Sequence, residues 1–167
     1  MPRPTVEHAD LMLRLYEMRR DPEMRRARAY MLSEFQATTW GDLGYLSGSE
    51  RDRHFRMVTS YWEMVAAIVN RGLIDEDLFF DTQGEGLFTW LRVRDLVSEG
   101  RKQLRPTWLW NLERMARRQQ AWRERANATV ERVIETGSKL APSVSRAAAP
   151  SLAAPSRVAK KTKKQGR

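Results

Sequence analysis

The stretch of residues 53–72 constrains the fold of this chain most, because it is apolar around most of a helix. Its apolar residues recur at helical spacing in two neighbouring stripes, Phe55, Val58, Trp62, Val65 and Val69, and Met57, Tyr61, Met64 and Ile68. A helix with so wide an apolar surface is normally buried among other helices. Ser49 is suited to cap its start, and Gly72 to end it. We therefore predict a central core helix that carries no chemistry of its own.

Two further helices are predicted before this core. Thr5 is suited to cap the first of them, and Asp21 followed by Pro22 both ends it and begins the next. The second helix places an apolar stripe inward and its arginines outward; the stripe is Met24, Ala27, Met31 and Phe35, and the arginines are Arg25, Arg26 and Arg28. Residues 36–48, with three glycines, are expected to form the longest loop between helices.

The pattern after the core helix is also helical. Residues 74–80 are expected to form a single turn or short helix, and residues 85–98 a longer one that Gly100 weakens. Pro106 is expected to open a last long helix, whose apolar spacing continues almost to Thr136. Strand-like alternation is not visible. We predict an all-α, compact bundle of five to six helices with a long C-terminal helix.

The composition changes sharply at Gly137. Residues 137–167 are rich in Ala, Ser and Pro and hold eight basic and no acidic residues, so they carry most of the net charge of +9. Such a segment buries too little apolar surface to offset its chain entropy. We therefore predict one helical domain over residues 1–136 and a disordered basic tail over residues 137–167. The high pI belongs to this tail, and the body is nearly neutral.

Composition also limits the classes of chemistry. The chain has no cysteine, which excludes disulfides and thiolate nucleophiles. Its longest nearly apolar run, residues 64–69, is far shorter than the roughly 20 residues of a membrane span. The start of the chain does not follow a signal-peptide pattern. We expect a cytoplasmic protein.

Two stretches, residues 7–21 (EHADLMLRLYEMRRD) and residues 61–85 (YWEMVAAIVNRGLIDEDLFFDTQGE), carry a resemblance to a known family. Over about residues 5–122 the chain resembles small bacterial proteins catalogued only as a domain of unknown function. The resemblance implies a compact helical domain. It implies no activity, cofactor or catalytic residue.

An acidic cluster is the first candidate site, for a metal or a cationic ligand. Its members are Asp75, Glu76, Asp77, Asp81 and Glu85. They do not follow a calcium loop, because Phe79 and Phe80 stand where an oxygen ligand and a glycine would be needed. The structural alternative is that these side chains cap helices, start a turn or occupy first helical turns.

Three other titratable residues could hold a metal or act as an acid. Glu63 lies within the core helix, where a structural ion pair with Arg56 or Arg71 is expected in preference to a functional acid. His8 and His54 do not follow a Glu three residues earlier, as a di-iron site would require, and are expected to be surface or capping residues. Neither pattern provides a metal site. We expect no metal, no cofactor and no catalytic residue.

Arginines alternate with tryptophans in the last helix, and lysines end the tail. Such segments can bind nucleic acid or anionic surfaces, although solvated arginines on a packed helix are the commoner explanation. The candidate polyanion contacts are Arg114, Arg117, Arg118, Lys160, Lys161, Lys163 and Lys164.

Three functions follow, in order of preference. The first is a non-enzymatic protein-binding or scaffold module with an unidentified protein partner. The alternative is an auxiliary nucleic-acid or anionic-surface binder that acts weakly and non-specifically through the basic last helix and the tail. The third is an enzyme with a carboxylate site in residues 75–85. The sequence does not indicate an oligomeric state.

Overall fold

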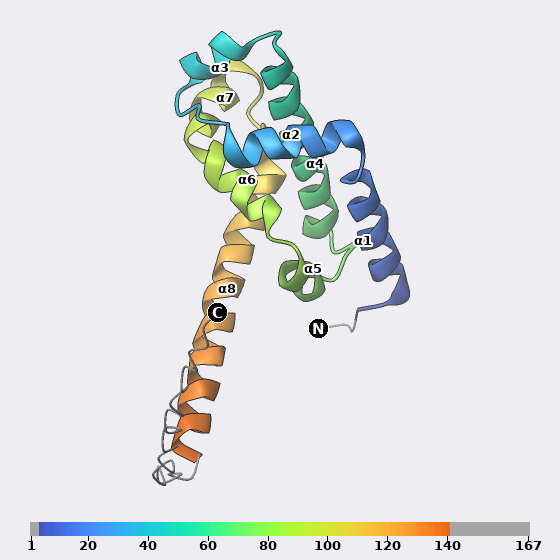
Figure 1. The fold of residues 1–167 in the computed structure, drawn as a ribbon, viewed down its shortest axis with the longest axis vertical. Helices are drawn as coiled ribbons and strands as arrows, with labels where there is room; N and C mark the ends of the chain where they lie inside the picture. Colours follow the sequence, from blue (N-terminus) through green and yellow to red (C-terminus); the bar gives the residue numbers. More distant parts are fainter. Residues whose placement is uncertain (1–3, 141–167) are drawn as a thin grey trace, which may run out of the picture.

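The computed structural model describes residues 4–140, apart from the side chains of Tyr45 and of residues 135–140, and this part contains helices and no strand. Figure 1 shows the arrangement of the helices, which are α1 (Val6–Met18), α2 (Pro22–Ser33), α3 (Trp40–Leu46), α4 (Glu50–Asn70), α5 (Glu76–Thr82), α6 (Glu85–Val93), α7 (Val97–Gln103) and α8 (Trp110–Leu140). A 3₁₀ turn, η1 (Arg94–Leu96), joins α6 to α7. The predicted all-α class with a long C-terminal helix is confirmed.

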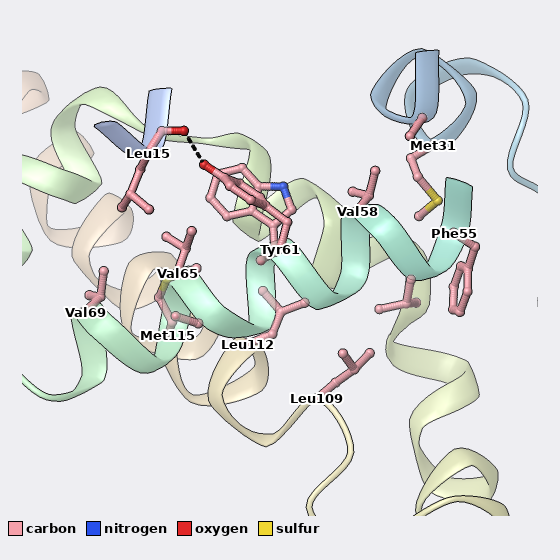
Figure 2. Packing of buried hydrophobic residues seen from close by; sticks show 14 of the residues in the cluster. Leu15, Met31, Phe55, Val58, Tyr61, Val65, Val69, Leu109, Leu112 and Met115 are labelled. Carbon is pink, nitrogen blue, oxygen red and sulfur yellow. Dashed lines mark hydrogen bonds between the residues drawn. The ribbon is translucent and has the colours of Figure 1, made fainter. Parts of the chain in front are cut away.

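Helix α4 lies at the centre, where α2 and α8 pack against it. All five residues of its first predicted stripe are buried, and Trp62 is only 1 % exposed. Figure 2 shows Val58, Val65 and Val69 of α4 packed among side chains from α2 and α8. In the second stripe Tyr61 is buried and donates a hydrogen bond to the carbonyl of Leu15 at 2.7 Å, which ties α1 to the core.

The ends of α4 form as predicted. The Ser49 hydroxyl accepts a hydrogen bond from the amide of Asp52, which satisfies one free donor of the first turn. At the other end Gly72 adopts a left-handed φ of 70°, and the amide of Leu73 donates to the carbonyl of Ile68. This is the glycine-terminated pattern in which the last carbonyls of a helix find donors.

Three boundaries differ from the sequence prediction. The expected loop of residues 36–48 contains α3, because Thr39 caps it and the Asp42 carboxylate accepts from the amides of Thr38 and Thr39. The helix expected over residues 85–98 is interrupted by η1 and resumes as α7. Pro106 does not open α8, since residues 106–109 form a turn and the helix begins at Trp110.

Helix α8 has a packed half and a projecting half. Leu112, Met115 and Ala116 are fully buried, whereas Val130, Val133 and Ile134 are 56 %, 66 % and 64 % exposed. Figure 1 shows this second half extending away from the other helices. The helix continues to Leu140, past the boundary predicted at Thr136, and the rest of the predicted tail lies outside the described residues. Within residues 4–140, the helices are all too short or too polar to span a membrane.

Candidate functional site

An open apolar groove lies between α3, α4 and the chain that leads into α8. Its volume is about 750 Å³, within the range of about 300–1,000 Å³ that is usual for ligand sites. Most of its lining is apolar, contributed by Trp40, Leu43, Phe55, Met64, Leu104, Trp108 and Leu109. The groove therefore gathers apolar side chains from three segments around one opening to solvent.

Two tryptophans form one wall of the groove, and a glycine sets their position. The rings of Trp40 and Trp108 meet edge to face, with centroids 5.7 Å apart and planes at 89°. A Cβ atom at Gly100 would overlap the Trp108 ring and lie 2.9 Å from that of Trp40. Only glycine allows the backbone of α7 to approach both rings so closely. The wall therefore depends on Gly100, which from sequence alone indicated only a weak helix end.

A strained residue joins this wall to α8. Leu109 is buried and has a φ of 52°, the only positive φ of a non-glycine residue in the described part of the chain. This left-handed conformation is unfavourable for a branched side chain and persists only where the surroundings enforce it. Here it turns the Leu109 side chain into the core while the backbone enters α8. Sequence patterns do not reveal such a conformation in a leucine.

Glu63 of α4 holds the first turn of α8. Its carboxylate accepts hydrogen bonds from the amides of Asn111 at 3.0 Å and Leu112 at 2.8 Å, and from the Asn111 side-chain amide at 2.8 Å. A carboxylate is favoured at this end of a helix, where amides without intrahelical partners and the helix dipole both attract negative charge. Glu63 therefore fixes the floor of the groove at the junction of α4 and α8.

The expected ion pair of Glu63 with Arg56 or Arg71 is wrong. Arg56 pairs instead with Asp52 at 3.0 Å, and Arg71 donates to the carbonyl of Ala67 at 3.1 Å. Arg56 lies on α4 and Arg71 directly follows its last residue, and each finds an acceptor one turn away. The amides at the start of α8 were not predicted, because that start was placed at Pro106.

A basic hollow of about 520 Å³ adjoins the groove and shares Glu63, Arg105 and Asn111 with it. Arg71, Arg105 and Arg114 line it from three different segments. The guanidiniums of Arg105 and Arg114 are exposed and have no carboxylate partner among the described residues. The carboxylate of Glu63, in contrast, already accepts hydrogen bonds from the first backbone amides of α8. The net character of this rim is therefore positive.

The acidic cluster proposed from sequence is dispersed over separate partners. Asp75 caps α5, because its carboxylate accepts a hydrogen bond from the amide of Leu78 at 2.9 Å. Glu76 pairs with Arg118 at 2.7 Å, and the Asp77 carboxylate accepts a hydrogen bond from the Trp122 indole at 2.9 Å. Asp81 is exposed. Glu85 lies apart, with arginines of α1 and α2. Within the described residues, no three of these carboxylates come close enough together to form a metal-binding group.

Glu85 is the most enclosed of these carboxylates. It accepts from Arg19 at 2.6 Å and from Arg28 at 2.7 and 2.5 Å, and its side chain is 13 % exposed. Burial alone raises the pKa of Glu85, but the two guanidiniums outweigh that effect, so its pKa is lowered. The hydrogen bonds between Arg28 and Glu85 in turn raise the pKa of Arg28. The prediction that Arg28 faces solvent is wrong, because α6 brings a carboxylate to it from far along the chain.

Of the candidate polyanion contacts on α8, only Arg114 is free of a carboxylate. Arg117 pairs with Glu113 at 2.5 Å, and Arg118 pairs with Glu76 and also donates to Asn70. Lys160, Lys161, Lys163 and Lys164 lie outside the described residues. The structure thus brings Arg114 together with Arg71 and Arg105, two arginines that sequence reasoning did not select.

The fold and groove define an all-α domain built on one buried helix, with an open apolar site beside the start of its last helix. Residues 4–119 match the family model described as Domain of unknown function (DUF4760), and the chain belongs to this family. The matched segment includes the whole groove and ends within α8, before its projecting half. Comparisons with curated proteins and with solved structures gave no match.

Proposed function

We propose that this domain is a non-enzymatic protein-binding module whose groove receives an apolar segment of a partner protein, with acidic residues beside the apolar ones. The observation that carries the proposal is the open apolar groove beside a hollow lined by Arg105 and Arg114, which have no carboxylate partner within residues 4–140.

The shape and lining of the groove support a protein segment as the occupant. Trp, Met and Arg are enriched in the cores of protein interfaces, and Trp108, Met64 and Arg105 all line this site. Met64 lies on the outer side of α4 and is 40 % exposed, although its helical spacing matches that of the core residues. A partner side chain placed over Met64 would remove this apolar surface from water.

Charge supports the acidic character of the partner. The carboxylates that line the groove, Asp52 and Glu63, already accept hydrogen bonds from backbone amides. Arg105 and Arg114 remain available at the rim. Complementary charges at the edge of an interface speed association and select among partners. A basic segment would meet repulsion at this rim, and an acidic one would be attracted.

The engagement of Glu63 also favours binding over acid–base catalysis. A general base must present a free lone pair to its substrate within hydrogen-bond reach. Both oxygens of Glu63 are directed at the first turn of α8. Proton abstraction by Glu63 would require release of the helix start, which its hydrogen bonds oppose.

Site-specific photocrosslinking tests the proposal. A photoreactive residue at Ser60, which is exposed and lines the groove, should form adducts with a partner protein in cells of the native host. The same probe at Ser98, exposed on α7 outside the groove, is the position control. The adducts at Ser60 should map to a peptide in which apolar and acidic residues alternate along one face.

Matched charge variants complete the test. Met64→Glu should abolish the Ser60 adduct, whereas Leu91→Glu, at a similarly exposed apolar residue on α6, should leave it unchanged. An equal yield of adducts at Ser60 and Ser98 would contradict the proposal. Persistence of the Ser60 adduct in Met64→Glu would also contradict it.

A second candidate function, the binding of a polyanion, is favoured by the convergence of Arg71, Arg105 and Arg114 on one hollow. Each phosphate contact contributes a steep salt dependence without reading sequence. For this function, Arg114→Gln should weaken binding to duplex DNA and lower the salt slope by about 1. Arg94→Gln, on the surface and paired with Asp95, is the control. Equal slopes for the two variants would eliminate the hollow as a polyanion site.

A further inference from the structure

His54 is buried in the core-facing side of α4 and lacks a partner for one of its ring nitrogens. Its side chain is 9 % exposed, and its Nε2 atom is buried without a hydrogen bond. Buried polar atoms in folded proteins almost always have a partner, so an orphan of this kind requires an explanation. The expectation that His54 is a surface or capping residue is wrong, although it does describe His8, which accepts from the amide of Thr5 at 3.3 Å.

Two carboxylates face this nitrogen. Glu50 precedes His54 by one helical turn on α4, and its Oε1 lies 3.8 Å from Nε2. Glu23, in the first turn of α2, places its Oε1 3.5 Å from the same nitrogen. Both separations exceed the 2.7–3.2 Å of an ordinary N–H···O bond. The ligand atoms of all three residues lie within 4.8 Å of one another.

These separations fit the edges of a metal coordination shell. A tetrahedral zinc ion with bonds of about 2.0–2.2 Å places its ligand atoms about 3.3–3.6 Å apart. The 3.5 Å separation falls in this range, and the 3.8 Å separation requires only a small movement of Glu50, whose side chain is 64 % exposed. An ion at this point would give Nε2 the partner that it lacks.

We propose that Glu23, Glu50 and His54 form a binding site for a divalent transition metal, with Zn²⁺ the best match. One imidazole and two carboxylates suit zinc, with water in the fourth position, better than they suit Mg²⁺ or Ca²⁺, which prefer oxygen ligands alone. The bound ion would link α2 to α4, the two helices at the centre of the fold. This site is distinct from the groove and does not depend on the function proposed for it.

Two arginines compete with the ion for the carboxylates. Arg26 forms a hydrogen bond with Glu23, and Arg53 lies 4.0 Å from Glu23 and 3.7 Å from Glu50. Their side chains are 61 % and 60 % exposed, so both can move into solvent when a metal binds. This competition places the expected affinity for Zn²⁺ in the micromolar range, below that of closed structural zinc sites.

Calorimetric titration of the full chain with Zn²⁺ at pH 7.4 tests the proposal. The result expected is one saturable site with a micromolar Kd. Glu50→Gln should weaken it at least tenfold, and His54→Gln should remove it. Glu17→Gln, an amide substitution at an exposed residue of α1, should leave the Kd unchanged. Because Glu50 is largely exposed, Glu50→Gln should retain the fold. Its zinc affinity therefore tests the site even if His54→Gln is unstable.

Imidazole NMR resonances give a second readout, since the chain contains only two histidines. Zinc should shift the ring signals of His54 and leave those of His8 in place. The proposal is overturned by the absence of saturable binding below 100 µM zinc, a concentration about tenfold above the expected affinity range. It is equally overturned by binding that survives in Glu50→Gln with unchanged affinity, or by shifts confined to His8.

Discussion

Replacement of Glu85 by glutamine should be among the most destabilising single changes in this domain. Glu85 of α6 joins α1 and α2 through Arg19 and Arg28, whose side chains are 11 % and 22 % exposed. The amide variant keeps the size of the side chain and removes its charge. It also turns an NH₂ group toward guanidinium donors in either orientation.

The size of the effect follows from these contacts. Hydrogen bonds to charged groups contribute about 1.5–3 kcal/mol each, and loss of one partner from a buried ion pair costs about 3–5 kcal/mol. With its oxygen in place of Oε2, glutamine can still accept two of the three hydrogen bonds, though without the negative charge, and Arg19 retains its bond to Gln83 at 2.7 Å. We therefore expect a loss of about 3 kcal/mol in the free energy of unfolding at pH 7.

The pH dependence of that loss has a defined sign. Folding lowers the pKa of Glu85 below its ordinary value of 4.5, so the unfolded chain binds this proton more tightly than the folded one. The stabilisation is complete above about pH 5.5, where both states are ionised, and is lost as the pH falls through the folded pKa. The difference between wild type and Glu85→Gln should accordingly stay constant from about pH 8 to 5.5 and shrink below the unfolded pKa.

Urea unfolding followed by circular dichroism, repeated at several pH values, measures both quantities. Glu17→Gln removes an exposed charge and serves as the control, with an expected change within about 0.5 kcal/mol. A loss below about 1 kcal/mol for Glu85→Gln would show that the two arginines are solvated and that α6 does not depend on this cluster. A difference between wild type and variant that grows toward low pH would refute the sign of the argument.

Three further predictions concern the core, the groove and the tail. Trp62→Ala should cost about 3–5 kcal/mol in urea unfolding, because a large and fully buried side chain is removed, and a cost below about 1 kcal/mol would contradict its burial. Gly100→Ala should destabilise the domain by about 1–3 kcal/mol and change Trp fluorescence, since the added methyl meets two indole rings, whereas Gly44→Ala, where a Cβ would meet nothing within 4 Å, should do neither. Truncation after Leu140 should leave the thermal midpoint unchanged, because the buried residues of the described chain end at Gln119. It should abolish DNA binding at low salt, for which the slope of log K against log salt concentration is about −4.5 with five phosphate contacts. A steep slope retained by the truncated chain would assign that binding to the helical body.

Local periodicity was sufficient to predict the core of the fold. The spacing of Phe55, Val58 and Trp62 identified the buried face of α4 because side chains one turn apart necessarily share a face. Capping chemistry was equally local, so Asp21 and Gly72 were assigned from the residues beside them. Met64 shows the limit of this reasoning, since its spacing matches the core but no helix of the described chain covers it.

The sites depend on residues that only the folded chain brings together. Glu85 is separated from Arg19 by 66 residues and from Arg28 by 57, and Glu63 is 48 residues from Asn111. No spacing rule connects residues at such distances. The left-handed Leu109 and the contact of Gly100 with Trp108 are likewise tertiary features without a sequence signal.

His54 is an intermediate case, in which a signal existed. Glu50 and His54 are four residues apart, a spacing that places both side chains on one helical face. This pair does not follow the Glu-x-x-His spacing of di-iron sites, so the metal pattern sought in the sequence did not include it. The third member, Glu23, belongs to α2 and could not be assigned without the packing of α2 on α4.

The two halves of α8 have unequal local stability, although the backbone continues as one helix. Residues up to Gln119 are held by tertiary packing, whereas Val130, Val133 and Ile134 rely on intrahelical hydrogen bonds alone. Isolated helical segments of this length are marginal in water and open on the submicrosecond timescale. Amide hydrogens near Leu112 should therefore exchange slowly, only through global unfolding of the domain. Those toward Ile134 should exchange progressively faster, through local opening of the helix. A helix of this kind has a rigid base and a fluctuating end, and the point where protection falls away marks the limit of the cooperative folding unit.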